Sequence, residues 1–377
     1  MKYQLPVKVK MGETVIEIIG RDVKEYGKKA LIVTDKGIVN NGLVEPIIDS
    51  LTEYGVQFII FDEVVSNPTV KNVEDATNVF ISNECDVLVA VGGGSPIDTA
   101  KAVGVIATNG GKITDYDGFD KFEKDPIPQF NVPTTVGTGS EVSMGAVISD
   151  PENKSKLVVA SERLYAIASY LDKRMVANLP GPICAATGID ALTHAIEGYV
   201  SKNANPFTDG LNLQAIRLIQ KHLRGATAGN PDDLYQSLIA ASIAGAGFHI
   251  AGLGLVHAIA NTVGGHFPVH HGVANSIILP HVMKFNLIAN FSKFADIAQA
   301  LGVNTNDLTE REAALQAVVE VENLMSDVGV PTRLRDVGVK EEAIPTIAEE
   351  ALHAIDRPTN PRKNTVKEIE EITRSAF

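Results

Sequence analysis

Short apolar segments alternate with amphipathic segments through the first half of the chain, and this alternation limits the possible folds more than any other feature. The apolar runs occupy 29–34, 56–61, 87–91 and 130–132. They are short and continuously apolar, so they predict strands of a sheet covered on both faces. Helical spacing occupies the segments between them, at about 38–54, 70–83 and 96–108. Strand, helix and strand in repetition predict a parallel sheet with right-handed crossovers.

The pattern changes in the middle of the chain. Residues 146–161 predict a hairpin with its turn at 150–153. Beyond about residue 180 the strand signal stops, and helical spacing continues to the C-terminus. We therefore expect two domains, an α/β domain over 1–180 and an all-α domain over 181–377, with a ligand-binding cleft between them. A length of 377 residues suits two domains.

Charge and cysteine usage exclude several classes of partner. With 33 basic and 46 acidic residues the net charge is −13, and no Lys/Arg-rich run offsets it. Such a surface repels phosphate backbones and anionic lipids, so neither nucleic acid nor membrane is an expected partner. Cys85 and Cys184 lie too far apart in the sequence to indicate a disulfide framework or a thiolate metal site. The N-terminus lacks the apolar core of a signal peptide, and a cytoplasmic location is expected.

One long stretch, 234–283, contains no Asp, Glu, Lys or Arg. A membrane span needs only about 20 apolar residues, so this stretch is long enough to form one. It also carries Pro268 and six histidines, and polar side chains at that density are costly in hydrocarbon. Helices buried around a polar site in a folded core are the better interpretation.

Two glycine-rich turns each follow a predicted strand. In the first, Gly92 to Asp98, Ser95 suits a helix N-cap, and Asp98 is placed to reach back to free backbone donors. A phosphate can approach such a turn and meet the positive end of the helix, although a lone turn of this kind can also be only a strand-to-helix connection. The second turn, 134–140, strengthens the nucleotide interpretation, because open α/β sheets bind ligands at this edge.

Asp35 ends the first predicted strand of this region. There its carboxylate can accept a hydrogen bond from a ribose hydroxyl and would repel a 2′-phosphate. The alternative is a simple turn and helix cap.

A second group of polar residues lies in the helical half. Asp190 and His194 are four residues apart and share one helical face. By itself such a pair can be an ordinary hydrogen bond. The residues on either side of the pair are apolar, however. Further along the chain, His257 and His271 follow in a stretch without charged residues. Three imidazoles and one carboxylate suit Fe²⁺ or Zn²⁺. Four further histidines can be outer partners of such a site or plain core residues: His249, His266, His270 and His281.

Several motifs together resemble the iron-containing (group III) alcohol dehydrogenase family. They are NPT at 67–69, GGGSPIDTAKA at 92–102, VPTTVGTGSE at 132–141, GIDALTHAIEGY at 188–199, GLGLVHAIA at 252–260 and HHGVANSIILPHV at 270–282. The resemblance covers nearly the whole chain and implies a Rossmann-like N-terminal domain, a helical C-terminal domain, a nicotinamide nucleotide and a divalent metal. It also implies a homodimer or a larger homo-oligomer.

The resemblance assigns residues to both sites. The metal-binding positions of the family match Asp190, His194, His257 and His271. The positions that touch the dinucleotide match Asp35, Asn67, Gly93, Gly94, Ser95, Asp98, Thr134, Thr135, Thr138 and Lys156. Asp35 resembles the residue of members that prefer NAD over NADP. Phe248 is expected to wall the substrate pocket, with a core role as the alternative.

The chain departs from the family at Asn261, where members commonly carry a histidine near the nicotinamide. An amide exchanges no proton near neutral pH. The function expected from the resemblance is metal-dependent, NAD-linked interconversion of a small alcohol or diol with its aldehyde or ketone. Two alternatives stay open: an NAD-using lyase or synthase that resembles dehydroquinate synthase, and a catalytically impaired scaffold or assembly protein that has lost its working histidine.

Overall fold

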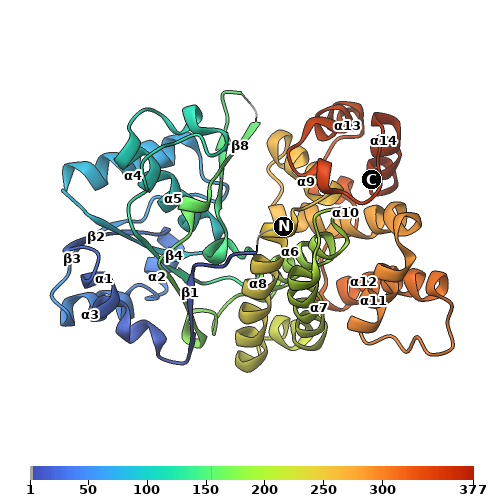
Figure 1. Ribbon diagram of the computed structural model, residues 1–377, viewed down its shortest axis with the longest axis horizontal. Coiled ribbons are helices and arrows are strands. Elements are labelled where there is room, and N and C mark those ends of the chain that lie inside the picture. Colours follow the sequence, from blue (N-terminus) through green and yellow to red (C-terminus); the bar gives the residue numbers. More distant parts are fainter. Residues whose placement is uncertain (1–2, 154) are drawn as a thin grey trace. The chain divides into compact units, whose positions relative to one another are not determined.

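The computed structural model describes residues 3–153 and 155–377. Within them the chain forms two compact units, whose elements are labelled in Figure 1. The sheet unit comprises Gln4–Thr135 and Ser140–Asn178, and the helical unit comprises Leu179–Phe377 together with Tyr3 and the short segment Val136–Gly139. Each unit is described separately below.

The sheet unit contains a six-stranded sheet and a smaller three-stranded one. The strands are β1 (Lys8–Gly12), β2 (Lys29–Val33), β3 (Gln57–Phe61), β4 (Val87–Gly92), β5 (Gly118–Phe119), β6 (Gln129–Pro133), β7 (Gly145–Asp150), β8 (Ser155–Ala160) and β9 (Ala168–Asp172). The helices are α1 (Ile19–Lys24), α2 (Lys36–Asn40), α3 (Glu45–Glu53), α4 (Val70–Ser82) and α5 (Gly94–Asn109).

The six-stranded sheet is parallel, as predicted, with strand order β1-β9-β6-β4-β2-β3. At one edge of the sheet, strands from distant parts of the sequence are neighbours, because β1 pairs with β9. The strand β9 was not predicted, although all five of its residues are buried. At the centre, β4 and β6 are neighbours, and Gly92 is paired with Pro133 at their carboxyl ends.

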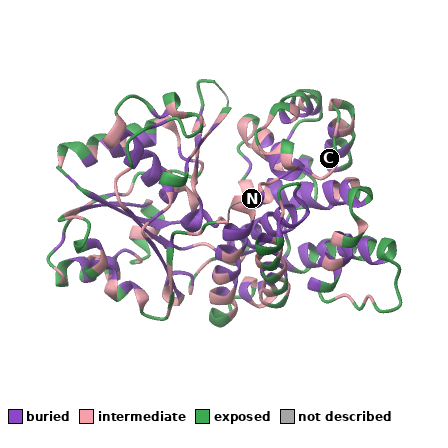
Figure 2. Cartoon of the chain, viewed as in Figure 1, coloured by how far each residue is buried: buried purple, intermediate pink, exposed green. Residues whose placement is uncertain are grey.

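Side chains alternate between the two faces of the sheet. In β2, Ala30 and Ile32 pack into one hydrophobic cluster, and Leu31 and Val33 pack into another. The first cluster includes residues of α1 and α3, and the second includes residues of α4 and α5. Helices therefore cover both faces, which explains why these strands are apolar throughout (Figure 2). The predicted α/β class is confirmed.

The small sheet contains the predicted hairpin. Strands β7 and β8 pair antiparallel, from Gly145 opposite Ala160 to Asp150 opposite Ser155. The Asp150 carboxylate accepts hydrogen bonds from the backbone of Glu152 and Asn153, as expected of a turn-forming Asp.

The helical unit contains no strand from Leu179 to Phe377, a range that the structure describes completely. Its helices are α6 (Gly181–Val200), α7 (Pro206–Thr227), α8 (Pro231–Ala251), α9 (Leu255–His266), α10 (His271–Asn286), α11 (Phe291–Ala300), α12 (Glu310–Val328), α13 (Ile344–His353) and α14 (Val366–Ser375), with short 3₁₀ turns between several of them. The first two begin with Pro near their N-termini, where a missing N–H costs nothing.

Among the described residues, α8 alone is long and apolar enough to cross a membrane by composition. Within its most apolar window, 61% is buried inside the structure. Burial of this kind is typical of a helix in a folded core, which agrees with the interpretation of 234–283 made from its histidine and proline content.

Candidate functional site

The helix α6 supplies two buried polar side chains to one face. Asp190 is 3% exposed and His194 is 4% exposed, in a helix whose other side chains are almost all apolar or small. Because they are four residues apart, both lie on the same side, and Asp190 Oδ1 is 3.9 Å from His194 Nε2. A pair at this spacing could have been a surface hydrogen bond, but burial excludes that alternative.

Two more histidines reach the same point from the start of other helices. His257 lies in the first turn of α9, and His271 is the first residue of α10. The next residue, Gly272, permits the close approach of α10 to α6, because a Cβ atom there would lie 2.4 Å from the carbonyl oxygen of Ala186. Asp190 Oδ1 is 3.9 Å from His257 Nε2 and 3.8 Å from His271 Nε2.

The four candidate ligand atoms form one compact group. One atom from each of Asp190, His194, His257 and His271 lies within 4.8 Å of the others. A tetrahedral ion with ligand distances of about 2.1 Å holds its ligand atoms roughly 3.4 Å apart. The separations of 3.8–3.9 Å around Asp190 Oδ1 are within a few tenths of an ångström of that value. One carboxylate and three imidazoles are also a donor set that Fe²⁺ and Zn²⁺ accept.

A neighbouring amide shows where positive charge is favoured. Asn275 Nδ2 donates to Asp190 Oδ1 at 2.6 Å and lies 3.1 Å from His257 Nε2 and 3.0 Å from His271 Nε2. Its partner atom, Asn275 Oδ1, is buried without a hydrogen bond. An electropositive NH₂ group thus touches three of the four ligand atoms, and these residues fit a bound cation.

The electrostatics of the group follow from its burial. Desolvation raises the pKa of Asp190, but the three nearby histidines and the Asn275 amide outweigh it, so the pKa lies below its ordinary value. Burial lowers the pKa of His194 to about 4 and keeps its ring neutral at physiological pH. Burial also opposes protonation of His257, yet its hydrogen bond to Glu197 and the nearby carboxylates raise its pKa.

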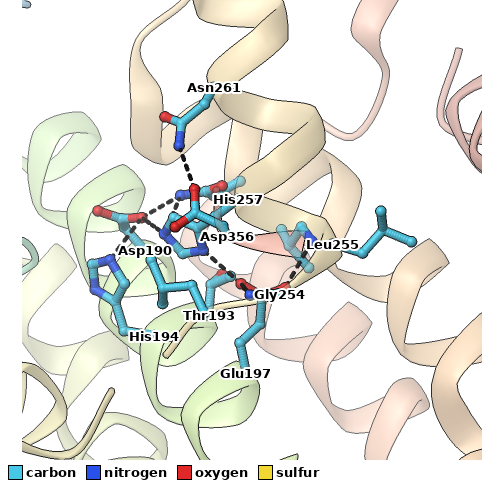
Figure 3. Close-up of polar contacts among 12 residues, drawn as sticks. Asp190, Thr193, His194, Glu197, Gly254, Leu255, His257, Asn261 and Asp356 are labelled. Carbon is cyan, nitrogen blue, oxygen red and sulfur yellow. Dashed lines mark hydrogen bonds and ion pairs between the residues drawn. The ribbon is translucent and has the colours of Figure 1, made fainter. Parts of the chain in front are cut away.

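Three further residues lie next to this group, of which Glu197 and Asn261 are labelled in Figure 3. The ring of Phe248 stacks on the His194 imidazole, with centroids 4.3 Å apart. Glu197 Oε2 lies 2.6 Å from His257 Nδ1. Asn261, the position of the family departure, donates from Nδ2 to Asp356 Oδ2 at 3.0 Å. Phe248 therefore covers one candidate ligand, and Asn261 is held by a carboxylate.

The other histidines of the uncharged stretch and its surroundings do not join the group. His266 Nε2 lies 2.8 Å from Glu350 Oε2, and His281 Nδ1 lies 2.8 Å from Ser375 Oγ. His270 is exposed, and His249 is partly buried with its ring edge toward Phe248. Among the described residues, only the set containing Asp190 forms such a cluster.

In the sheet unit, the first residues of both glycine-rich turns lie side by side. Thr134 N donates to the carbonyl oxygen of Gly92 at 3.0 Å. A Cβ atom on Gly93 would lie 3.1 Å from Thr135 Cγ2, and Gly92 has a φ of +150°. Close packing and a backbone conformation that L side chains rarely adopt both require glycine at this edge.

Two details of the first turn differ from prediction. The N-cap of α5 is Gly93, and Gly94 and Ser95 already lie within the helix, so the predicted cap at Ser95 is wrong. Asp98 also does not reach back to the helix start. Its Oδ1 accepts from Ser140 Oγ at 2.5 Å and its Oδ2 from Val147 N at 2.9 Å. The following turn offers Asp98 better donors than its own helix because that turn lies against α5.

The remaining predicted dinucleotide residues occupy several segments. Asp35 caps α2 by accepting from Ile38 N at 3.0 Å, the local role weighed as its alternative. Asn67 has a positive φ of 58° just before Thr69, which bridges to Ser149 of β7. Lys156 is opposite Ser149 in the hairpin.

Thr138 belongs to the other unit. Its neighbours Gly137 and Gly139 pack on α6 and α8, where added Cβ atoms would lie 2.4 Å from Thr187 O and 2.6 Å from Gly245 Cα.

Sequence reasoning missed the residues that support the ligand group. Glu197 is the only acidic residue of α6 besides Asp190, and its spacing of three from His194 places it on the same face. That signal was available. Asn275 lies four residues after His271 and gives a weaker signal of the same kind. Asp356 lies far along the chain, and no local pattern connects it with Asn261.

A family model described as iron-containing alcohol dehydrogenase matches residues 6–173, and a model for the C-terminal part of the Fe-containing alcohol dehydrogenase family matches 184–377. The chain is 44% identical to 1,3-propanediol dehydrogenase of Citrobacter freundii, over 97% of this chain and 96% of that protein. It is 40% identical to lactaldehyde reductase of Escherichia coli K12, over 97% of each.

Solved structures of related enzymes have the same fold. The fold matches that of a 1,3-propanediol oxidoreductase with a TM-score of 0.97 and 43% identity, covering 100% of this chain and 99% of that chain. It also matches sulfoacetaldehyde reductase from Bifidobacterium kashiwanohense, solved in complex with NAD⁺, with a TM-score of 0.88 and 25% identity, covering 100% of this chain and 98% of that one.

Proposed function

Because this chain belongs to the iron-containing alcohol dehydrogenase family, we propose that it interconverts a small alcohol or diol with its aldehyde or ketone, using NAD(H) as hydride carrier. The observation that carries the proposal is the buried group of one carboxylate and three imidazoles within 4.8 Å of one another. Asp190, His194, His257 and His271 would hold the metal, which is Fe²⁺ by family and Zn²⁺ as the alternative.

The protein's contribution to the chemistry follows from the state of these side chains. When bound, the cation supplies Lewis acidity, which favours the alkoxide form of an alcohol and polarises a carbonyl. His194 is neutral, so one of its ring nitrogens has a lone pair that could bind a cation, and Asp190 provides one negative charge. Phe248, stacked on His194, covers one side of the group and would exclude water from substrate.

NAD, when bound, would supply the hydride acceptor for oxidation of the alcohol. The alcohol oxygen must also lose a proton. Asn261 cannot accept that proton near neutral pH, and it is hydrogen-bonded to Asp356. His266 is also engaged, with its Nε2 2.8 Å from Glu350 Oε2.

The sheet unit would bind the dinucleotide along the carboxyl ends of its central strands. Gly93, Gly94 and Ser95 open α5, whose N-terminal N–H groups favour a pyrophosphate. Further residues proposed to contact it are Asp35, Asn67, Asp98, Thr134, Thr135, Thr138 and Lys156. A carboxylate at Asp35 favours NAD over NADP, since it would repel a 2′-phosphate.

The test is a metal and cofactor matrix. Protein purified without oxygen is depleted of metal, reloaded with Fe²⁺ or Zn²⁺, and assayed with short alcohols and diols in the presence of NAD or NADP. We expect NADH formation that depends on metal, with NADP slower. Asp190→Asn, loaded in parallel, serves as the control for non-specific metal effects.

Each alternative function predicts a different result. A lyase or synthase like dehydroquinate synthase uses NAD without net NADH formation. An inert scaffold gives no turnover even when elemental analysis shows one bound metal per chain. Either result across the substrate panel would contradict the dehydrogenase proposal.

We also propose a cytoplasmic location and a homodimeric or larger assembly. The free, buried thiols of Cys85 and Cys184 suit a reducing compartment and support the first, and the family resemblance supports the second. Light scattering on the purified protein, with a mass of 40.2 kDa per chain, would detect a dimer, and cell fractionation would test the location.

A further inference from the structure

Glu197 is a buried carboxylate that accepts three hydrogen bonds from the start of α9. It is 4% exposed. Its Oε1 accepts from Val256 N at 2.7 Å, and its Oε2 accepts from Gly254 N at 3.0 Å and lies 2.6 Å from His257 Nδ1 (Figure 3). A single side chain of α6 therefore contacts both the backbone and the candidate ligand of another helix.

We propose that Glu197 is a positioning residue that orients His257 for metal binding. An ionised carboxylate only accepts hydrogen bonds, so the proton of the neutral His257 ring must lie on Nδ1. The lone pair is then on Nε2, the atom 3.9 Å from Asp190 Oδ1 and 3.1 Å from the Asn275 amide nitrogen. A partner of this kind selects the tautomer and the ring orientation that a cation needs.

Glu197 also determines where the first turn of α9 lies. The first N–H groups of a helix have no partner within it and carry partial positive charge, so a carboxylate is favoured there. Gly254 makes room for this contact, because a Cβ atom at that position would lie 2.8 Å from Glu197 Oε1. Since His257 is in this turn, the same three hydrogen bonds place both its backbone and its ring.

The same helix start provides a matched control. Asn360 Oδ1 accepts from Leu255 N at 3.2 Å, between the two backbone donors that Glu197 uses. Asn360 is also buried, at 1% exposed, and its side-chain hydrogen bonds go to Leu255, Asn286 and Arg362. A substitution there weakens the cap of α9 without removing the hydrogen bond to His257.

The inference rests on the proposed metal site and is tested by binding, separately from turnover. Metal-depleted native protein, Glu197→Gln and Asn360→Ala are titrated with Co²⁺, followed by its visible absorption, and the unfolding midpoint in urea of each metal-free protein is measured. Gln keeps the size of Glu197 but replaces one acceptor oxygen with an NH₂ donor. We expect the Kd for Co²⁺ to rise roughly 10- to 100-fold in Glu197→Gln. In Asn360→Ala it should change less than about threefold, although both variants lose stability.

Three other results would decide against the inference. Equal affinity in Glu197→Gln and native protein would show that Glu197 only caps the helix. Equal loss of affinity in both variants would show that helix stability alone governs binding. Native protein that binds no Co²⁺ would overturn the metal site itself, and with it the proposed function. If Glu197→Gln does not fold, Glu197→Asp takes its place, and at least a tenfold higher Kd is expected because the shorter side chain cannot span the same distance; an unchanged Kd overturns the inference.

Discussion

Each unit of this protein buries a cluster of charged side chains, and the two clusters are organised in opposite ways. In the helical unit, Asp190 Oδ1 lies 3.8–3.9 Å from a ring nitrogen of each of three histidines, too far for hydrogen bonds. One amide nitrogen, Asn275 Nδ2, is shared among three of these ligand atoms. In the sheet unit, Lys101 and Asp98 each have close hydrogen-bond partners of their own.

In the sheet-unit cluster, the buried Lys101 ammonium group is surrounded by hydrogen-bond acceptors. Lys101 is 2% exposed, and its Nζ donates to Ser140 O at 2.8 Å, Ser143 Oγ at 3.0 Å and Gly145 O at 2.7 Å. Burial lowers the pKa of Lys101 to about 8 despite the nearby Asp98, and burial raises the pKa of Asp98. A charge with this many partners ties α5 to the turn between β6 and β7 and is structural.

This difference shows that burial alone does not identify a functional site. Both clusters have strongly shifted pKa values, which are often taken as a sign of a functional site. What distinguishes them is how the polar atoms are partnered. Ligand atoms that converge on one point and share a single amide donor indicate a place for a cation, whereas a charge with several close partners of its own indicates a structural role.

The largest effect on stability is expected from removing the Lys101 charge in the sheet-unit cluster. Lys101→Met leaves the buried Asp98 carboxylate without its cation, and loss of one member of a buried pair costs about 3–5 kcal/mol. Urea unfolding measures this loss. The double variant Asp98→Asn with Lys101→Met removes both charges and should recover a large part of it. A loss below about 1 kcal/mol in the single variant would mean that the cluster is not structural.

An intermediate effect is expected in the cluster of Asp190 and three histidines, where a substitution should change the affinity for metal more than the stability. Asp190→Asn removes the only negative ligand, so the affinity for Co²⁺ should drop by more than the roughly 100-fold that loss of an outer partner can cost. The metal-free protein should change in stability by about 1 kcal/mol or less, because Asp190 makes a single hydrogen bond there, with Asn275. A loss of stability as large as that of Lys101→Met would remove the contrast between the clusters.

The smallest effect concerns stability at acid pH, and it arises from a histidine outside the cluster of Asp190 and three histidines. His281 lies on α10 outside the ligand group, and burial, with Lys284 and Arg333 nearby, lowers its pKa to about 4. Between pH 6.5 and 4 the unfolded chain therefore binds a proton that the folded chain does not, and stability falls as the pH falls. The full loss is about 2 kcal/mol after allowance for partial exposure.

His281→Gln should reduce this acid sensitivity. The measurement is the urea midpoint of metal-free native and variant protein from pH 7 to pH 4. If both lose stability in parallel, the acid sensitivity arises elsewhere, with the buried His194 as the first candidate.

Much of the architecture could be predicted because it follows from local patterns. The apolar runs at 29–34 and 87–91 became central strands, since only buried parallel strands are apolar on both faces. Beyond about residue 180 the predicted helical spacing became a unit of helices, beginning with α6 at Gly181–Val200. In contrast, β9 was missed, because its run Ala168–Asp172 has no clear flanking turn signal and its identity as a strand depends on pairing with β1 and β6.

The amino-acid sequence alone determined the fold class and placed Asp190 and His194 on one helical face, because helical periodicity and residue chemistry are local properties. The family motifs in the sequence then assigned the four residues expected to bind metal. Only the tertiary structure decided which of the nine histidines meet, that Glu197 and Asn275 surround them, and that Asp98 is used by Lys101 and Ser140. These outcomes depend on contacts between segments tens of residues apart, such as Gly272 against Ala186, and helical periodicity carries no information on them.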